Sequence, residues 1–211
     1  MNSAMKRQAV GKVLQGALHS VQLSDPGSVY DQVLREVSER TEMERSIGKA
    51  GIGALVVWKR IDARTTWANS LMLMPEGDLR EITSRAYALA VDESVPTPVA
   101  GLAAREVLFD VPGLTRKSTG ALASAVLLAM SPTRMAVWDR WVGTALATLK
   151  MRPKPGSGFY GRYLEVALEL AEIMRDVSTS DELIFPRHVD LALMHAGRNP
   201  EMRAQLERAA S

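Results

Sequence analysis

Apolar residues recur at helical spacing along almost the whole chain, and no segment alternates apolar and polar residues as a half-buried strand would. Ala, Leu, Met, Glu and Arg, which favour helices, dominate the periodic segments. Pro and Gly divide the pattern into short pieces, most clearly at 24–28 and 150–158. The sequence therefore predicts a compact all-α fold in which short connections join about ten helices.

Local signals set the expected limits of these helices. Pro75 suits the first turn of a helix, where Glu76 and Asp78 would lie near the positive end of the helix dipole. A short apolar segment at 52–58 follows a group of glycines. We expect helices over about 4–20, 29–44, 75–91, 99–109, 117–130, 132–149, 159–177, 187–196 and 200–209, and another that ends at 72 after a cap at Asp62 or Thr65.

A length of 211 residues suits one domain, or two small helical lobes that flank a cleft, and we expect a single helical domain over 1–211. Charges interrupt every long apolar run, so no membrane span is expected. The chain has no cysteine, which excludes disulfides and iron–sulfur clusters. Because the N-terminus lacks the apolar region and cleavage site of a signal peptide, we expect a cytoplasmic protein, associated with the nucleoid when bound to DNA. We also expect a monomer.

The net charge of +2 hides an uneven distribution of charge along the chain. Residues 111–164 hold eight Lys and Arg but one acid, Asp139, whereas residues 165–211 hold nine acids and five bases. A basic region around a single carboxylate is what a surface that follows a phosphate backbone requires. An ordinary solvated face has the same pattern, so the charges alone do not decide between the two interpretations.

A tight turn with flanking cations lies in this basic region, at Val111-Pro112-Gly113-Leu114-Thr115-Arg116-Lys117. Pro and Gly permit a sharp reversal between the helices expected at 99–109 and 117–130. The backbone N–H groups that begin the second helix, helped by Arg116 and Lys117, could hold a DNA phosphate without reading any base. An ordinary helical hairpin uses the same kind of turn.

Asp139 follows the turn, 26 residues after Gly113. A carboxylate close to C1′ of a nucleotide stabilises the positive charge that develops when the N-glycosidic bond breaks, or it activates a water. Trp138, Arg140 and Trp141 could shield such a group from solvent. Asp139 could equally cap the helix that follows or pair with a nearby arginine, and the cap is compatible with catalysis.

Together these segments resemble the helix-hairpin-helix superfamily of DNA glycosylases, in particular the oxoguanine-glycosylase branch. The superfamily's hairpin reads Leu-Pro-Gly-Val-Gly, then a polar residue, then Lys in that branch, and Lys117 likewise lies four residues after Gly113. The stretch Pro132–Asp139 is similar to the Pro-x-x-x-Val-x-Asp-like stretch that carries the family's catalytic Asp at the start of a helix, here 137–141. The resemblance is specific over about 100–145 and loose elsewhere.

The chain departs from the family pattern in three respects. Thr115 stands in place of the second hairpin glycine, and the interval from Lys117 to Asp139 is a few residues longer than usual. The chain also lacks the cysteine tail that binds a cluster, which excludes the iron–sulfur branch. These departures bear most on a lyase role for Lys117.

The resemblance implies an enzyme that flips a damaged or modified base out of double-stranded DNA and cleaves its N-glycosidic bond. Asp139 would be the catalytic carboxylate, and Lys117 either an amine nucleophile that forms a Schiff base or a phosphate-binding cation.

The resemblance also implies which residues contact DNA. These belong to the 99–130 hairpin and its surroundings: Gly113, Thr115, Arg116, Ser118, Arg140 and Lys154. Stacking or pocket residues would be Trp58, Trp138, Trp141 and Tyr160, although each aromatic taken alone is more often a core residue. Outside the motif, Trp58, beside Lys59 and Arg60, is the one most expected to be exposed. No metal, nucleotide or flavin cofactor is expected.

The sequence leaves the excised base open. The family includes repair enzymes for oxidised, alkylated and mismatched bases, and analogy extends the expectation to glucosylated hydroxymethylated pyrimidines of phage DNA, removed in antiviral defence. One alternative is a non-catalytic DNA-binding module that uses the same hairpin. Another is a helical protein-interaction domain with no role on DNA.

Overall fold

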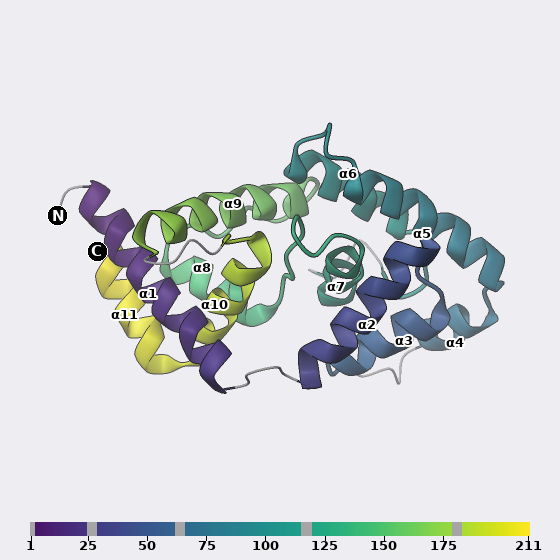
Figure 1. Ribbon diagram of the computed structural model, residues 1–211, viewed down its shortest axis with the longest axis horizontal. Coiled ribbons are helices and arrows are strands. Elements are labelled where there is room, and N and C mark those ends of the chain that lie inside the picture. Colours follow the sequence, from purple (N-terminus) through teal and green to yellow (C-terminus); the bar gives the residue numbers. More distant parts are fainter. Residues whose placement is uncertain (1–2, 25–28, 62–65, 115–119, 179–182) are drawn as a thin grey trace. The chain divides into compact units, whose positions relative to one another are not determined.

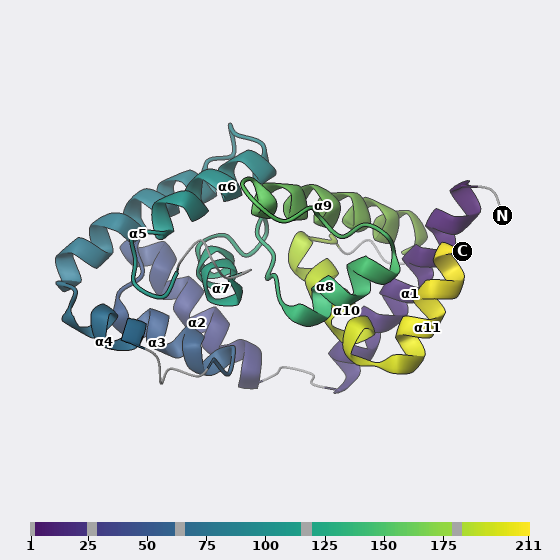
Figure 2. The same ribbon diagram turned by 180° about the vertical axis from the view of Figure 1, so that it is seen from behind.

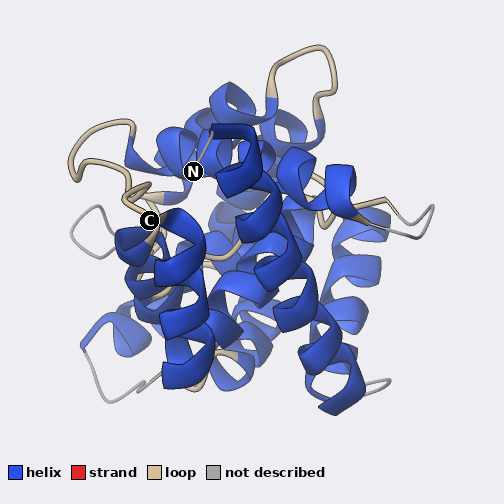
Figure 3. Ribbon diagram, turned by 90° about the vertical axis from the view of Figure 1, so that its left-hand side faces the viewer, coloured by secondary structure: helices blue, strands red, loops and turns tan. Residues whose placement is uncertain are grey.

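The computed structural model describes residues 3–24, 29–61, 66–114, 120–178 and 183–211. Within these ranges the chain forms eleven α-helices (Figure 1), seen from behind in Figure 2, and no strand (Figure 3), which confirms the all-α prediction. No helix in the described ranges has the length and apolar character needed to cross a membrane. The helices are α1 (Ser3–Ser24), α2 (Val29–Glu44), α3 (Lys49–Trp58), α4 (Thr66–Leu73), α5 (Glu76–Val91), α6 (Thr97–Leu108), α7 (Ala121–Met130), α8 (Arg140–Thr148), α9 (Phe159–Val177), α10 (Pro186–Arg198) and α11 (Pro200–Ala210).

The chain divides into two compact units. Unit 1 combines Met1–Pro26 with Trp138–Ser211 and therefore contains α1 and α8–α11. Unit 2 is continuous, Gly27–Val137, and contains α2–α7. The length of the chain allowed one domain or two helical lobes, and the structure shows two units.

In unit 1 the long N-terminal helix α1 packs against α9, α10 and α11 from the other end of the chain (Figure 1). Gly11 permits the close approach of α1 to α9, because a Cβ at this position would lie 2.8 Å from the carbonyl oxygen of Ile173. At Gly197 the space is smaller still, since a Cβ there would overlap the backbone carbonyl of Trp141. Small residues thus bring α10 directly against α8, the helix that begins after Asp139.

In unit 2 the core is built around α7. Every residue from Leu122 to Met130 is buried, as expected of a helix that is apolar on all sides. Helices α2, α3, α5 and α6 each contact α7. The small residues of α7 therefore line a buried interface.

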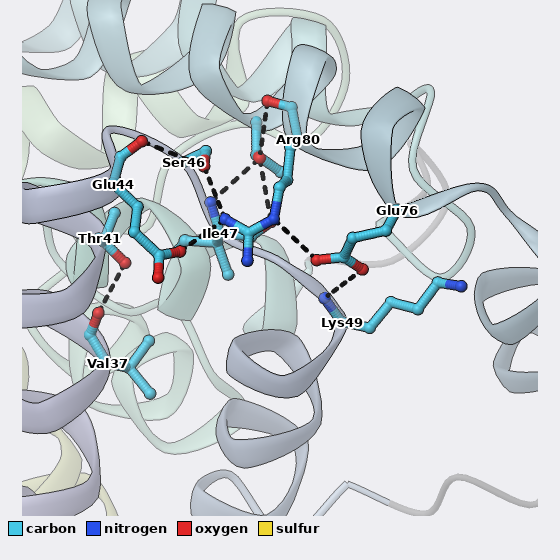
Figure 4. A network of polar contacts seen from close by, with 9 residues as sticks. Val37, Thr41, Glu44, Ser46, Ile47, Lys49, Glu76 and Arg80 are labelled. Atoms are coloured by element: carbon cyan, nitrogen blue, oxygen red, sulfur yellow. Dashed lines mark hydrogen bonds and ion pairs between the residues drawn. The ribbon is translucent and has the colours of Figure 1, made fainter.

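A polar network fixes the connection between α2 and α3 onto α5 (Figure 4). The hydroxyl of Thr83 donates to the carbonyl of Ile47 (3.0 Å) and accepts from its N–H (3.1 Å). The guanidinium of Arg80 bridges the carboxylates of Glu44 and Glu76. Because these contacts satisfy the backbone of a buried connection, we interpret this network as structural.

Two predicted helix limits were wrong. The helix expected over 117–130 begins at Ala121, after Gly120 in a left-handed conformation (φ 49°), and positions 117–119 lie outside the described residues. The helix expected over 132–149 begins only at Arg140. The segment before it is a turn followed by extended backbone, in which residues 135–138 are buried. Residues 135–137 belong to unit 2, and Trp138 belongs to unit 1.

Candidate active site

Asp139 is the N-cap of α8. One carboxylate oxygen, Oδ1, accepts hydrogen bonds from the backbone N–H groups of Trp141 (2.8 Å) and Val142 (3.0 Å). The backbone of Asp139 is extended (φ −143°), as an N-cap requires, and its side chain is partly exposed. The carboxylate is therefore held in one orientation at the positive end of a helix, where a negative charge is favourable.

The residue before this carboxylate is anchored in the core of unit 1. Trp138 is 2% exposed, and its ring meets those of Phe159 and Tyr163 edge-on at centroid distances of 4.7 and 5.1 Å. On its other side the indole lies against Gly143 of α8, where a Cβ would come within 3.0 Å of it. These contacts join the first turns of α8 and α9 and so fix the backbone that carries Asp139.

The unit that contains Asp139 also holds a cluster of polar side chains, Tyr163, Arg187 and Asp190. Arg187 and Asp190 of α10 form an ion pair of 2.6 Å whose side chains are 14% and 3% exposed. Burial raises the pKa of the Tyr163 phenol well above its ordinary value, and the charges of Asp190 and Asp139 add to this effect while Arg187 opposes it. Asp139 and Asp190 therefore both influence the pKa of the same buried phenol, that of Tyr163.

Sequence reasoning missed this cluster. Arg187 and Asp190 are three residues apart, a spacing that brings them together on a helix, but such pairs usually lie on solvated faces. Only the packing of α10 against α8 and α9 shows that this pair is buried. His188 has a local role, since its Nδ1 accepts the backbone N–H of Phe185 (3.1 Å) at the start of α10.

Most of the aromatic residues proposed for base stacking are core residues. Trp58 and Trp138 are 2% exposed and Tyr160 is 1% exposed, so none presents a ring face to a nucleotide in this structure. The expectation that Trp58 is exposed was wrong, because it lies on the same buried face of α3 as Leu55. Trp141 differs: it is partly exposed, and the guanidinium of Arg140 lies over its ring at 4.4 Å.

The described part of the hairpin is a turn built on Gly113. Its φ of 89° lies in the left-handed region, and the N–H of Leu114 donates to the carbonyl of Val111 (3.0 Å). The Trp67 ring packs directly against Gly113 and leaves no space for a Cβ. Thr115, Arg116, Lys117 and Ser118, the other hairpin residues expected to bind DNA or act on it, lie outside the described residues.

The basic region is smaller than its sequence suggests. Arg134 is partly buried in unit 2, where its guanidinium donates to the carbonyls of Ala90 (2.9 Å), Asp92 (2.7 Å) and Val95 (2.6 Å). The cations expected to contact DNA in unit 1, Arg140 and Lys154, are both exposed. Thus part of the positive charge is used to hold the α5–α6 connection, and part is available to a partner.

Within the described ranges, no group of three or more His, Asp or Glu side chains is placed to hold a metal ion. The groups that the structure describes with the Asp139 carboxylate are the guanidinium of Arg140 over the Trp141 ring and the Arg187–Asp190 ion pair with Tyr163. Comparison with protein-family models, curated proteins and solved structures finds no match to this chain.

Proposed function

We propose that the protein is a DNA glycosylase in which Asp139 is the catalytic carboxylate. The observation that carries this proposal is the placement of Asp139, the single acid of the basic region 111–164, held at the start of α8 by two backbone N–H groups. A carboxylate whose orientation is fixed in advance stabilises a developing positive charge without reorganisation during the reaction. Its partial exposure leaves it accessible to a nucleotide.

The proposed reaction is hydrolysis of the N-glycosidic bond of a flipped nucleotide. As the bond from C1′ to the base breaks, its electron pair leaves with the base, and the carboxylate of Asp139 stabilises the oxocarbenium-like sugar. Water then adds its oxygen to C1′ and gives up a proton, which the departing base takes up, so that the products are a free base and an abasic site. Trp141, with Arg140 over its ring, is the aromatic residue next to Asp139 that can stack on a base.

The DNA strand is held, in this proposal, by the hairpin around Gly113 and by the exposed Arg140, which follows Asp139. Lys117 serves as a phosphate-binding cation, and its attack on C1′ as an amine is the bifunctional variant of the same scheme. Trapping with borohydride separates the two roles, because only a Schiff base is reduced to a stable cross-link. The substrate proposed by analogy includes modified pyrimidines of phage DNA, and oxidised or alkylated bases belong to the same test.

The experiment is base release from a panel of duplexes, detected as alkali-sensitive abasic sites, with Asp139→Asn beside the parent. The panel includes oxidised, alkylated, deaminated and mismatched bases and glucosylated phage DNA. Asn caps a helix about as well as Asp, so this variant keeps the fold and loses only the charge. We expect base release to fall by about 10²–10³-fold while duplex affinity changes little.

Asp139→Ala is the matched control, because it removes the cap as well as the charge. It should lower the free energy of unfolding by about 1 kcal/mol, which Asp139→Asn should not. Base release by Asp139→Asn at the parental rate would show that Asp139 is only a cap. Duplex binding by the parent with no base released across the panel would favour the alternative, a non-catalytic DNA-binding module.

A further inference from the structure

The connection between α8 and α9 carries a concentration of exposed positive charge. Lys150, Arg152 and Lys154 are all exposed in this loop, and residues 140–164 contain five Lys and Arg and no acid. No ion pair formed within the described residues involves any of these three side chains. We call residues 150–158, together with Arg162, the cationic loop.

Arg162 is built into this loop from the first turn of α9. Its Nη2 donates to the carbonyl of Lys154 (2.9 Å), so its guanidinium is folded back along the connection. A Cβ at Gly158 would lie 2.8 Å from Nη1 of Arg162, and the φ of Gly158 is 74°. The glycine therefore makes room for the arginine, which places a fourth cation beside the three exposed ones.

Positive charge is concentrated at one end of α9. The cations of the loop come just before or within the first turn of this helix, which is 19 residues long and whose N-terminal end is the positive end of its dipole. The acids of this helix begin only at Glu165 and continue toward its other end. A ligand with closely spaced negative charges would match this concentration of positive charge.

We infer that the cationic loop is a phosphate-binding surface that holds the backbone of duplex DNA, in addition to the contacts expected of the hairpin. The identification of the partner as DNA rests on the proposed function. Arginine and lysine both bind phosphate, and such contacts position a strand without reading its sequence. The loop thus increases affinity for any duplex, whereas the chemical step depends on Asp139.

The test compares two triple variants with the same change in net charge. The loop variant is Lys150→Gln, Arg152→Gln and Lys154→Gln, and the control is Lys12→Gln, Arg198→Gln and Arg208→Gln, three exposed cations of α1, α10 and α11. Affinity for a short fluorescent duplex is measured by anisotropy over a series of salt concentrations. Each phosphate contact contributes about 0.9 to the slope of log affinity against log salt, so the loop variant should lose about 2–3 from that slope.

The control variant should keep the parental slope to within about 0.5. Equal losses in the two variants, or no loss in the loop variant, would overturn the inference. A loop variant that loses binding to a polyglutamate peptide but keeps its slope on DNA would overturn it too, in favour of an acidic protein partner.

The binding test of the cationic loop and the base-release test of the proposed function can fail independently of each other. A reduced slope in the loop variant, with no base released by the parent, would leave the phosphate surface standing and remove the glycosylase. Loss of base release in Asp139→Asn, with a loop variant that binds as the parent does, would give the opposite result. At saturating duplex, the loop variant should release base at the parental kcat and differ only in KM.

Discussion

Replacing Gly113 with Ala tests the geometry of the turn directly. At a φ of 89° a residue with a side chain costs about 1–3 kcal/mol relative to glycine. The added Cβ would also lie 2.7 and 3.0 Å from two carbons of the Trp67 ring, closer than ordinary van der Waals contact. Overpacking of this kind costs about 1–3 kcal/mol, so the expected total loss of unfolding free energy is about 2–6 kcal/mol.

A double-mutant cycle with Trp67→Ala separates the two contributions. Without the indole there is no overlap, and Gly113→Ala should then cost only the backbone strain, about 1–3 kcal/mol. The measurement is urea-induced unfolding followed by circular dichroism for the parent, both single variants and the double variant. An equal cost of Gly113→Ala in both backgrounds would refute the contact with Trp67, and a cost below about 0.5 kcal/mol in the parent would refute the left-handed turn.

Two further predictions each concern one side chain, Tyr163 in unit 1 and Arg134 in unit 2. Because the pKa of Tyr163 is raised, the folded protein keeps this phenol protonated where the unfolded chain ionises, so stability should fall as the pH rises above about 10. Tyr163→Phe should make this fall shallower in urea midpoints measured at increasing pH, and an unchanged pH dependence would contradict the assigned burial. Arg134→Met should cost about 2–4 kcal/mol in urea unfolding, because three carbonyls lose a charged donor; a cost no larger than that of an exposed arginine, such as Arg208→Met, would show that these hydrogen bonds are not needed.

Local signals in the sequence predicted several helices closely. The helix expected at 159–177 is α9 (Phe159–Val177), and that expected at 75–91 is α5 (Glu76–Val91). Both follow a residue that ends the preceding structure, Gly158 and Pro75, and both carry an apolar stripe at helical spacing. Such limits depend on residues adjacent in sequence, which is why the pattern alone could place them.

Exposure was harder to predict than helix formation. Lys59 and Arg60 suggested an exposed surface at Trp58, yet successive residues of a helix point about 100° apart. Trp58 shares the buried face of Leu55, whereas Val57, although apolar, is exposed. Helical spacing in the sequence shows which residues share a face of a helix. Which of these faces is buried depends on the helices packed against it.

By itself, the sequence determined the helical class of the chain, the position of its main breaks and the isolation of Asp139 within a basic region. The tertiary structure decided that the N-terminal helix joins the C-terminal helices in one unit, that Arg134 donates to three backbone carbonyls of the other unit, and that Arg187 and Asp190 form a buried pair near Tyr163. The reason is physical. Helix formation and capping depend on neighbouring residues, whereas burial and the electrostatics of a site depend on contacts between segments distant in the chain, and these exist only once the helices have packed.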